Sequence, residues 1–189
     1  MDIDIDFPDR NKALMLFKHI AASRVDQGQL TRHNTGVYFH SVPIDPEKNI
    51  SAIPYNKDES LFKIDFLNVG IYNGVKNEAH LIELMEREPL WDLLEQDEFS
   101  SLLFHVNGHG SILRTTKPKS IEELAAVLAM IRPAKKHLVG KSWGEIFQEV
   151  WKKPTTDDYY FKKSHAIAYA HAIVVQMNLI CEQVGYEFS

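Results

Sequence analysis

Aspartates near the start of the chain have the spacing of a metal-binding strand. In the segment Asp2–Phe7, the aspartates Asp2, Asp4 and Asp6 alternate with large apolar residues. An extended strand would place all three carboxylates on one face. Like charges in a row repel, so such a face requires a cation or solvent. Carboxylates on one strand, joined by another from a neighbouring strand, suit a site for two Mg²⁺ ions. A frayed acidic terminus is the alternative interpretation.

A further aspartate, Asp65, lies within the apolar run Leu61–Leu67. A carboxylate in such a run needs a partner, because burial of an unpaired charge is costly. If this run forms a strand beside the first, Asp65 lies next to Asp4 and Asp6, and the three form one acidic site. Pairing of Asp65 with Lys63, or capping of the turn that follows, is equally consistent with the spacing.

Both segments resemble the catalytic palm of the bacterial replicative DNA polymerase III alpha subunit, a C-family DNA polymerase. Residues 2–7 (DIDIDF) are similar to the family's PDIDIDF strand, and residues 63–67 (KIDFL) to its KxDFLGL strand. Weaker similarities follow in the family's order. Residues 32–37 (RHNTGV) resemble RHxSxHAAGVVI, residues 102–105 with Leu113 resemble GVFQLES…M, residues 129–133 (AMIRP) resemble ALYRPGP, and residues 161–170 (FKKSHAIAYA) resemble FNKSHAAAYAL.

The resemblance implies nucleotidyl transfer from dNTPs to a DNA primer-template. Two Mg²⁺ ions would be held by Asp4, Asp6 and Asp65, with Asp2 as a supporting charge. The resemblance also implies that six basic residues bind the nucleotide and its phosphates: Arg32, His33, Arg132, Lys162, Lys163 and His165. Without the resemblance, isolated histidines such as His33 are typical of hydrogen-bonded structural residues, and Arg132 is typical of a solvated helix end.

This chain departs from the family in its length and in the parts that it contains. It has neither the Gly-Ser segment that contacts the triphosphate nor the thumb, which the family places between the equivalents of Asp6 and Arg32. Three interpretations follow. The chain is one piece of a split or miniaturised polymerase completed by a second protein chain, a non-catalytic relative that binds DNA or replisome components, or a small metal-dependent nuclease or phosphotransferase. The first is favoured, because the basic segments accompany the aspartates.

The composition is that of an ordinary globular protein, with 44% hydrophobic and 25% charged residues in 189. One cysteine, Cys181, excludes an internal disulfide and a cysteine-rich zinc site. Neither a long apolar run nor a leader pattern indicates a membrane or secretion, so we expect a cytoplasmic protein. Residues 1–109 carry a net charge of −8 and residues 110–165 a net charge of +5. An acidic part followed by a basic part suits an enzyme that handles phosphates.

The pattern of apolar residues predicts an α+β fold that is rich in helix. A palm-like lobe over residues 1–70 would carry the strands, and a fingers-like lobe over residues 71–189 would be helical. Strands are expected at 2–7, 36–40 and 61–69, and a helix at 9–25 with Asp9 as its N-cap and Phe17 packed on the sheet. Further helical segments are expected at 71–76, 78–87, 91–94, 98–105, 121–131, 140–151 and 159–184.

Overall fold

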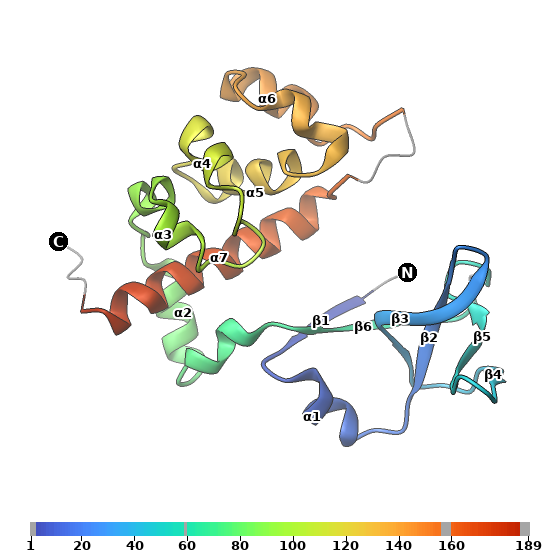
Figure 1. Cartoon of the computed structure of the whole chain (residues 1–189). Coiled ribbons are helices and arrows are strands. Elements are labelled where there is room, and N and C mark those ends of the chain that lie inside the picture. The colour runs from blue at the N-terminus through green and yellow to red at the C-terminus, as the bar shows by residue number, and fades with distance from the viewer. Residues whose placement is uncertain (1–2, 59, 156–159, 186–189) are drawn as a thin grey trace. The chain divides into compact units, whose positions relative to one another are not determined.

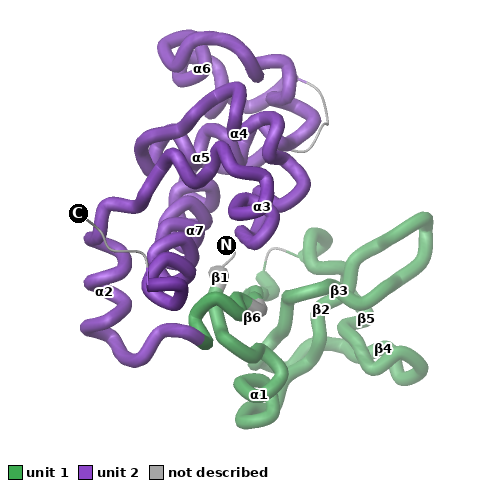
Figure 2. The backbone as a smooth tube through the Cα atoms, turned by 60° about the vertical axis from the view of Figure 1, so that its left-hand side comes forward, with its two compact units in different colours: residues 1–73 green, residues 74–189 purple. Residues whose placement is uncertain are grey.

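The chain is an α+β protein that divides into two compact units. The computed structural model describes residues 3–58, 60–155 and 160–185, and of Ile3, Asp4 and Asn68 it describes the backbone alone. Unit 1 is Met1–Asn73 and unit 2 is Gly74–Ser189, coloured separately in Figure 2. All of the described strands lie in unit 1, and the described residues of unit 2 are helical or irregular (Figure 1). The roles predicted for Asp2 and for residues 156–159 lie outside the described residues.

Unit 1 is built on a six-stranded mixed sheet with the strand order β1-β6-β3-β2-β5-β4. Its strands are β1 Ile3–Phe7, β2 Ile20–Asp26, β3 Gln29–Tyr38, β4 Ile44–Asp45, β5 Ile50–Pro54 and β6 Ile64–Asn68. β1 runs parallel to β6 and β2 parallel to β5, while the other neighbours are antiparallel. The strands β1 and β6 come from the two segments that the sequence predicted to lie side by side.

The register of β1 and β6 confirms that pairing. Asp4 is the partner of Asp65, and Asp6 lies one strand repeat further along, opposite Leu67. On the other face, Ile5 and Phe7 pack with Phe66 against helix α1, Arg10–Met15. Because side chains alternate along a strand, the apolar contacts with α1 direct Asp6 and Asp65 to the opposite face of the sheet.

The helix predicted over residues 9–25 is wrong beyond its first turns. Asp9 caps α1 as predicted, accepting from the backbone N–H groups of residues 11 and 12, but α1 ends at Met15. Residues 20–26 form β2, which is hydrogen-bonded on both sides, by β3 and by β5. Pairing with two neighbours outweighs the local helical spacing of apolar residues. Phe17, predicted to pack on the sheet, lies in the connection and is 55% exposed.

The chain breaks after residue 26, as the Gln-Gly-Gln sequence there indicates, but the break is a tight hairpin turn between two strands. Gln27 and Gly28 both have positive φ, 48° and 79°, and they connect β2 to β3 as a two-residue hairpin loop. β3 therefore begins at Gln29, seven residues before the predicted start of the second strand. The region after it, for which no element was predicted, contains the short strands β4 and β5.

The helices of unit 2 follow the predicted segments more closely. They are α2 Glu78–Glu86, α3 Asp97–Ser100, α4 Gly110–Thr116, α5 Ile121–Met130, α6 Trp143–Glu149 and α7 Lys163–Gln183. Short 3₁₀ segments lie at Gly70–Gly74, Trp91–Glu95 and Pro133–Leu138. Ser120 caps α5, accepting from the backbone N–H of Glu123. Two differences are that α4 was not predicted and that the helix expected over 98–105 is reduced to the single turn of α3.

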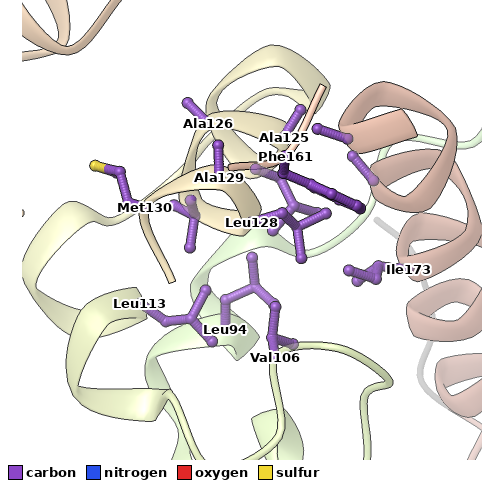
Figure 3. Close-up of a cluster of buried hydrophobic side chains, with 14 of the residues drawn as sticks. Leu94, Val106, Leu113, Ala125, Ala126, Leu128, Ala129, Met130, Phe161 and Ile173 are labelled. Carbon is purple, nitrogen blue, oxygen red and sulfur yellow. The ribbon is translucent and has the colours of Figure 1, made fainter. Parts of the chain in front are cut away.

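The core of unit 2 forms where α5 packs on α7. Residues 124–130 of α5 are all buried, and α7 contributes a buried face that includes Ala166, Ala170, Ile173 and Met177. Figure 3 shows Leu94, Val106 and Leu113 closing this cluster from the shorter segments. By length and composition, α7 is the one described helix apolar enough to cross a membrane, and its place in this core accounts for that composition.

Candidate functional site

A bulge in β3 shapes the acidic face of unit 1. Ala21 pairs with Val37, but Ser23 pairs with Arg32, so the single residue Ala22 stands opposite the four residues 33–36. Such bulges bend a strand and redirect its side chains. Here the bulge brings Thr35 and His33 to the carboxylate of Asp65 on the neighbouring strand β6.

Asp65 is only 8% exposed and is held on both of its oxygens. The hydroxyl of Thr35 donates to Oδ1 at 2.7 Å, and the ammonium of Lys63 pairs with Oδ2. Lys63 is itself buried, at 3% exposure, and its Nζ lies 5.3 Å from the centre of the Tyr55 ring. The buried ammonium compensates the buried carboxylate, so the pairing with Lys63 that the sequence left open is present.

His33 braces the bulge through one ring nitrogen. Its Nδ1 accepts the backbone N–H of Gly36 at 2.9 Å and that of Thr35 at 3.3 Å. A nitrogen that accepts these bonds carries no proton, which places the ring proton of the neutral imidazole on Nε2. The 3.7 Å approach of Nδ1 to Asp65 Oδ1 is therefore a contact without a shared proton.

Two arginines add positive charge around the bulge. Arg10 donates from Nη2 to the carbonyl of Thr35 at 3.1 Å. Burial lowers the pKa of Arg10, the charge of Arg32 lowers it further, and the charge of Asp65 opposes them. The carboxylate of Asp65 thus lies in an environment that contains the positive charges of Arg10, Arg32 and Lys63. A cation-rich face of this kind favours phosphate or another anion.

Arg10 and Thr35 were not predicted to be part of this site. Lys63 carried a detectable signal, because residues two apart on a strand share a face. Thr35 carried none, since its contact with Asp65 depends on the bulge. The contact of Arg10 with the bulge likewise depends on the helix that follows β1.

The acidic part of the site suits a hard divalent cation. Asp6 is exposed, and its charge adds to burial in raising the pKa of Tyr72. The side chain of Asp4 lies outside the described residues, and its backbone is placed beside Asp65 by register. Among the described side chains, no three His, Cys, Asp or Glu residues form a ready metal group. Oxygen donors fit Mg²⁺, and an ion on Asp65 Oδ2 would take the place that Lys63 now fills.

The other predicted basic residues lie in unit 2, and two of them meet at one aromatic ring. The guanidinium of Arg132 lies 5.2 Å from the centre of the Phe161 ring, and the His165 ring is edge-on to the same ring at 6.3 Å. Tyr169 stacks on Phe161 at 5.5 Å. Burial, and then the charge of Arg132, lower the pKa of the nearby His105. This cluster presents one fixed cation among aromatic rings.

Lys162 and Lys163 lie at the start of α7. Lys162 is its N-cap residue and Lys163 its first helical residue, and both side chains are exposed. Lys163 lines a hollow together with residues of α5 and of the segment around α6. Arg132 and His165 therefore lie together at the Phe161 ring, while Lys163 lies among the residues that line the hollow.

Comparisons with known proteins gave no match to this chain. The searched protein-family models, curated proteins and solved structures contain no match. The resemblance to C-family polymerases accordingly stands on the motif residues themselves.

Proposed function

We propose that this chain performs DNA-polymerase-like nucleotidyl transfer with two divalent ions, as one piece of a split or miniaturised C-family polymerase. The observation that carries the proposal is the parallel pairing of β1 with β6. It sets Asp4 directly beside Asp65, with Asp6 on the same strand as Asp4. The two motifs most specific to the family's palm are thus neighbours in the sheet, although 60 residues separate these two partners in the chain.

The three aspartates would hold Mg²⁺, and two such ions activate the attacking 3′-oxygen and stabilise the leaving pyrophosphate. Lys63 compensates the charge of Asp65 through their ion pair. Arg32, with Arg10 beside it, is proposed to bind phosphate on unit 1. We propose that His33 contributes to this phosphate site by holding the bulge in shape, because its Nδ1 already accepts hydrogen bonds from backbone N–H groups.

In unit 2, Arg132, His165, Lys162 and Lys163 are proposed to bind the nucleotide and its phosphates. The aromatic ring of Phe161 holds Arg132 and His165 in one place. The substrates would be a primer-template and dNTPs. A second protein chain would supply the Gly-Ser segment and the thumb that the family uses.

Primer extension tests this proposal. The purified chain is assayed alone and with companion replication proteins, with Mg²⁺ or Mn²⁺, beside Asp65→Asn and Asp26→Asn. We expect synthesis that requires a companion, that is lost in Asp65→Asn and that is retained in Asp26→Asn. Asp26 is a suitable control because it lies at the end of β2 in an exposed pair with Arg24. Synthesis unaffected by Asp65→Asn would refute the metal role.

One observation favours a second candidate, a non-catalytic relative that binds DNA or replisome components. The ion pair between Lys63 and Asp65 already compensates the carboxylate without a metal. This candidate predicts DNA binding that is the same in wild type and Asp65→Asn, with no metal-dependent synthesis under any condition. Metal-dependent DNA cleavage that is lost in Asp65→Asn would instead indicate a nuclease.

A further inference from the structure

A hollow in the surface of unit 2 combines aromatic rings with charged groups. Its volume is about 440 Å³, within the size range of small-molecule sites. α5, α6 and the start of α7 surround it, and both Figure 1 and Figure 2 show α5 between α6 and α7. The lining residues are Ser120, Glu122, Glu123, Phe147, Trp151 and Lys163.

The aromatic wall includes a stacked pair of rings and is partly open to solvent. Trp143 and Phe147 are four residues apart in α6, the spacing that places side chains on one side of a helix, and Trp151 follows the end of that helix. The rings of Trp143 and Phe147 stack at 5.7 Å with an interplanar angle of 27°. Phe147 is nevertheless 38% exposed. An exposed ring held by a stacked neighbour provides a preformed surface for another flat ring.

The polar wall supplies both a cation and a carboxylate. The exposed ammonium of Lys163 enters from the first residue of α7. Glu122 is exposed in the first turn of α5, while Glu123 is already engaged, accepting from the backbone N–H of Lys119 at 2.7 Å. The lysines Lys152 and Lys153 directly follow Trp151 in the chain and are exposed. Aromatic rings interleaved with lysines are typical of surfaces that bind single-stranded nucleic acid.

We propose that this hollow binds an unpaired base of single-stranded nucleic acid. The base stacks on Phe147 and Trp151, its exocyclic amino group donates to Glu122, and the adjoining phosphate contacts Lys163. A paired base is excluded, because its faces are covered within the duplex. The proposal concerns binding alone and does not depend on the metal site of unit 1.

Fluorescence anisotropy of a labelled oligodeoxycytidylate in the presence of EDTA tests the proposal, since neither metal nor catalysis is required. Loss of a stacking ring costs roughly 5- to 160-fold in affinity, so we expect Phe147→Ala to weaken binding by that factor and Phe147→Trp to retain it. Phe62→Ala is the matched control, because Phe62 is 39% exposed but lies in unit 1. It should bind as wild type does.

Salt dependence separates the stacking contribution from the charge. A phosphate contact on a single strand contributes a slope of about 0.7 to the plot of log Kd against log salt concentration. Lys163→Ala should lower the slope by that amount, while Phe147→Ala should leave the slope unchanged. Circular dichroism melting of each variant checks the fold, and we expect each variant to melt at the same temperature as wild type.

The proposal is overturned if Phe147→Ala binds the single strand as tightly as wild type, or if duplex DNA competes as well as unlabelled single strand. Either result would refute base binding in this hollow. If synthesis still required Asp65, the proposed nucleotidyl transfer would nevertheless stand.

Discussion

Replacing Gly36 with alanine should separate Lys63 from Asp65. Gly36 is the partner of Asp65 in the register of β3 and β6, so a side chain there would share the face of the carboxylate. A Cβ on Gly36 would lie 2.6 Å from Cδ and 3.0 Å from Cγ of Lys63, and 3.0 Å from Nδ1 of His33. These contacts are with the middle of a buried side chain, so Lys63 must move.

The cost has two parts. Forcing an extra methyl group into a packed region costs about 1–3 kcal/mol. If Lys63 leaves, Asp65 is a buried carboxylate without its ammonium, and breaking a buried pair in this way costs about 3–5 kcal/mol. We therefore expect unit 1 to lose between about 1 and 5 kcal/mol, depending on whether Lys63 shifts or leaves. Either value is large beside the total stability of a small unit.

Hydrogen exchange is the suitable assay, because all three tryptophans, Trp91, Trp143 and Trp151, lie in unit 2. Peptides from β3 and β6 should lose protection in Gly36→Ala, while α5 and α7 should not. Gly144→Ala is the control, since a Cβ there meets no atom within 4 Å and alanine is the better helix former.

A double-mutant cycle with Lys63→Ala tests the cause. If Gly36→Ala and Lys63→Ala remove the same ion pair, the free energies of unfolding of the double variant and of Lys63→Ala should agree within about 0.5 kcal/mol. Fully additive costs would refute the reasoning.

Three further outcomes follow from unit 2. Leu128→Ala should lower the free energy of unfolding by about 2–5 kcal/mol, measured by urea titration of tryptophan fluorescence, because Leu128 is 1% exposed in the core of Figure 3. Asn178→Ala should cost about 1–3 kcal/mol in the same assay, since the Asn178 amide donates to two carbonyls at the end of α2, at 2.8 and 2.9 Å. Hydrogen bonds from Lys76 and then His80 lower the pKa of Glu182 to about 2 from 4.5. The contribution of ionised Glu182 to the free energy of unfolding is thus complete above pH 4.5 and lost as the pH falls towards 2. The difference in that free energy between wild type and Glu182→Gln should therefore shrink over this range, measured by urea titration at each pH.

Periodicity predicted those elements in which the local spacing of apolar residues agrees with the structure that the segment adopts. The alternation in residues 2–7 indicated β1, and the apolar run after Ser120 indicated α5. Residues 20–26 show the limit of this reasoning. Their helical spacing is real, but the segment becomes β2 because β3 and β5 lie on both sides of it, and a local pattern contains no information about such neighbours.

The strand pairing behind the acidic part of the candidate site was predictable, while the side chains around Asp65 were predictable only in part. The sequence placed Asp65 beside Asp4, and the register confirms it. The partners of Asp65 were harder to predict from the sequence. Lys63 was one of two equal alternatives, and Thr35 reaches the carboxylate only because a four-residue bulge interrupts β3. Metal binding by the aspartates stays a prediction.

Mn²⁺ binding followed by electron paramagnetic resonance tests that prediction most directly. Since Asp65 would lose a ligand oxygen and Lys63 competes for the same place, the account predicts opposite effects of two substitutions. Asp65→Asn should weaken Mn²⁺ binding by at least about tenfold, and Lys63→Ala should strengthen it, with Asp26→Asn unchanged. Equal Mn²⁺ affinity in wild type and Asp65→Asn would contradict the account.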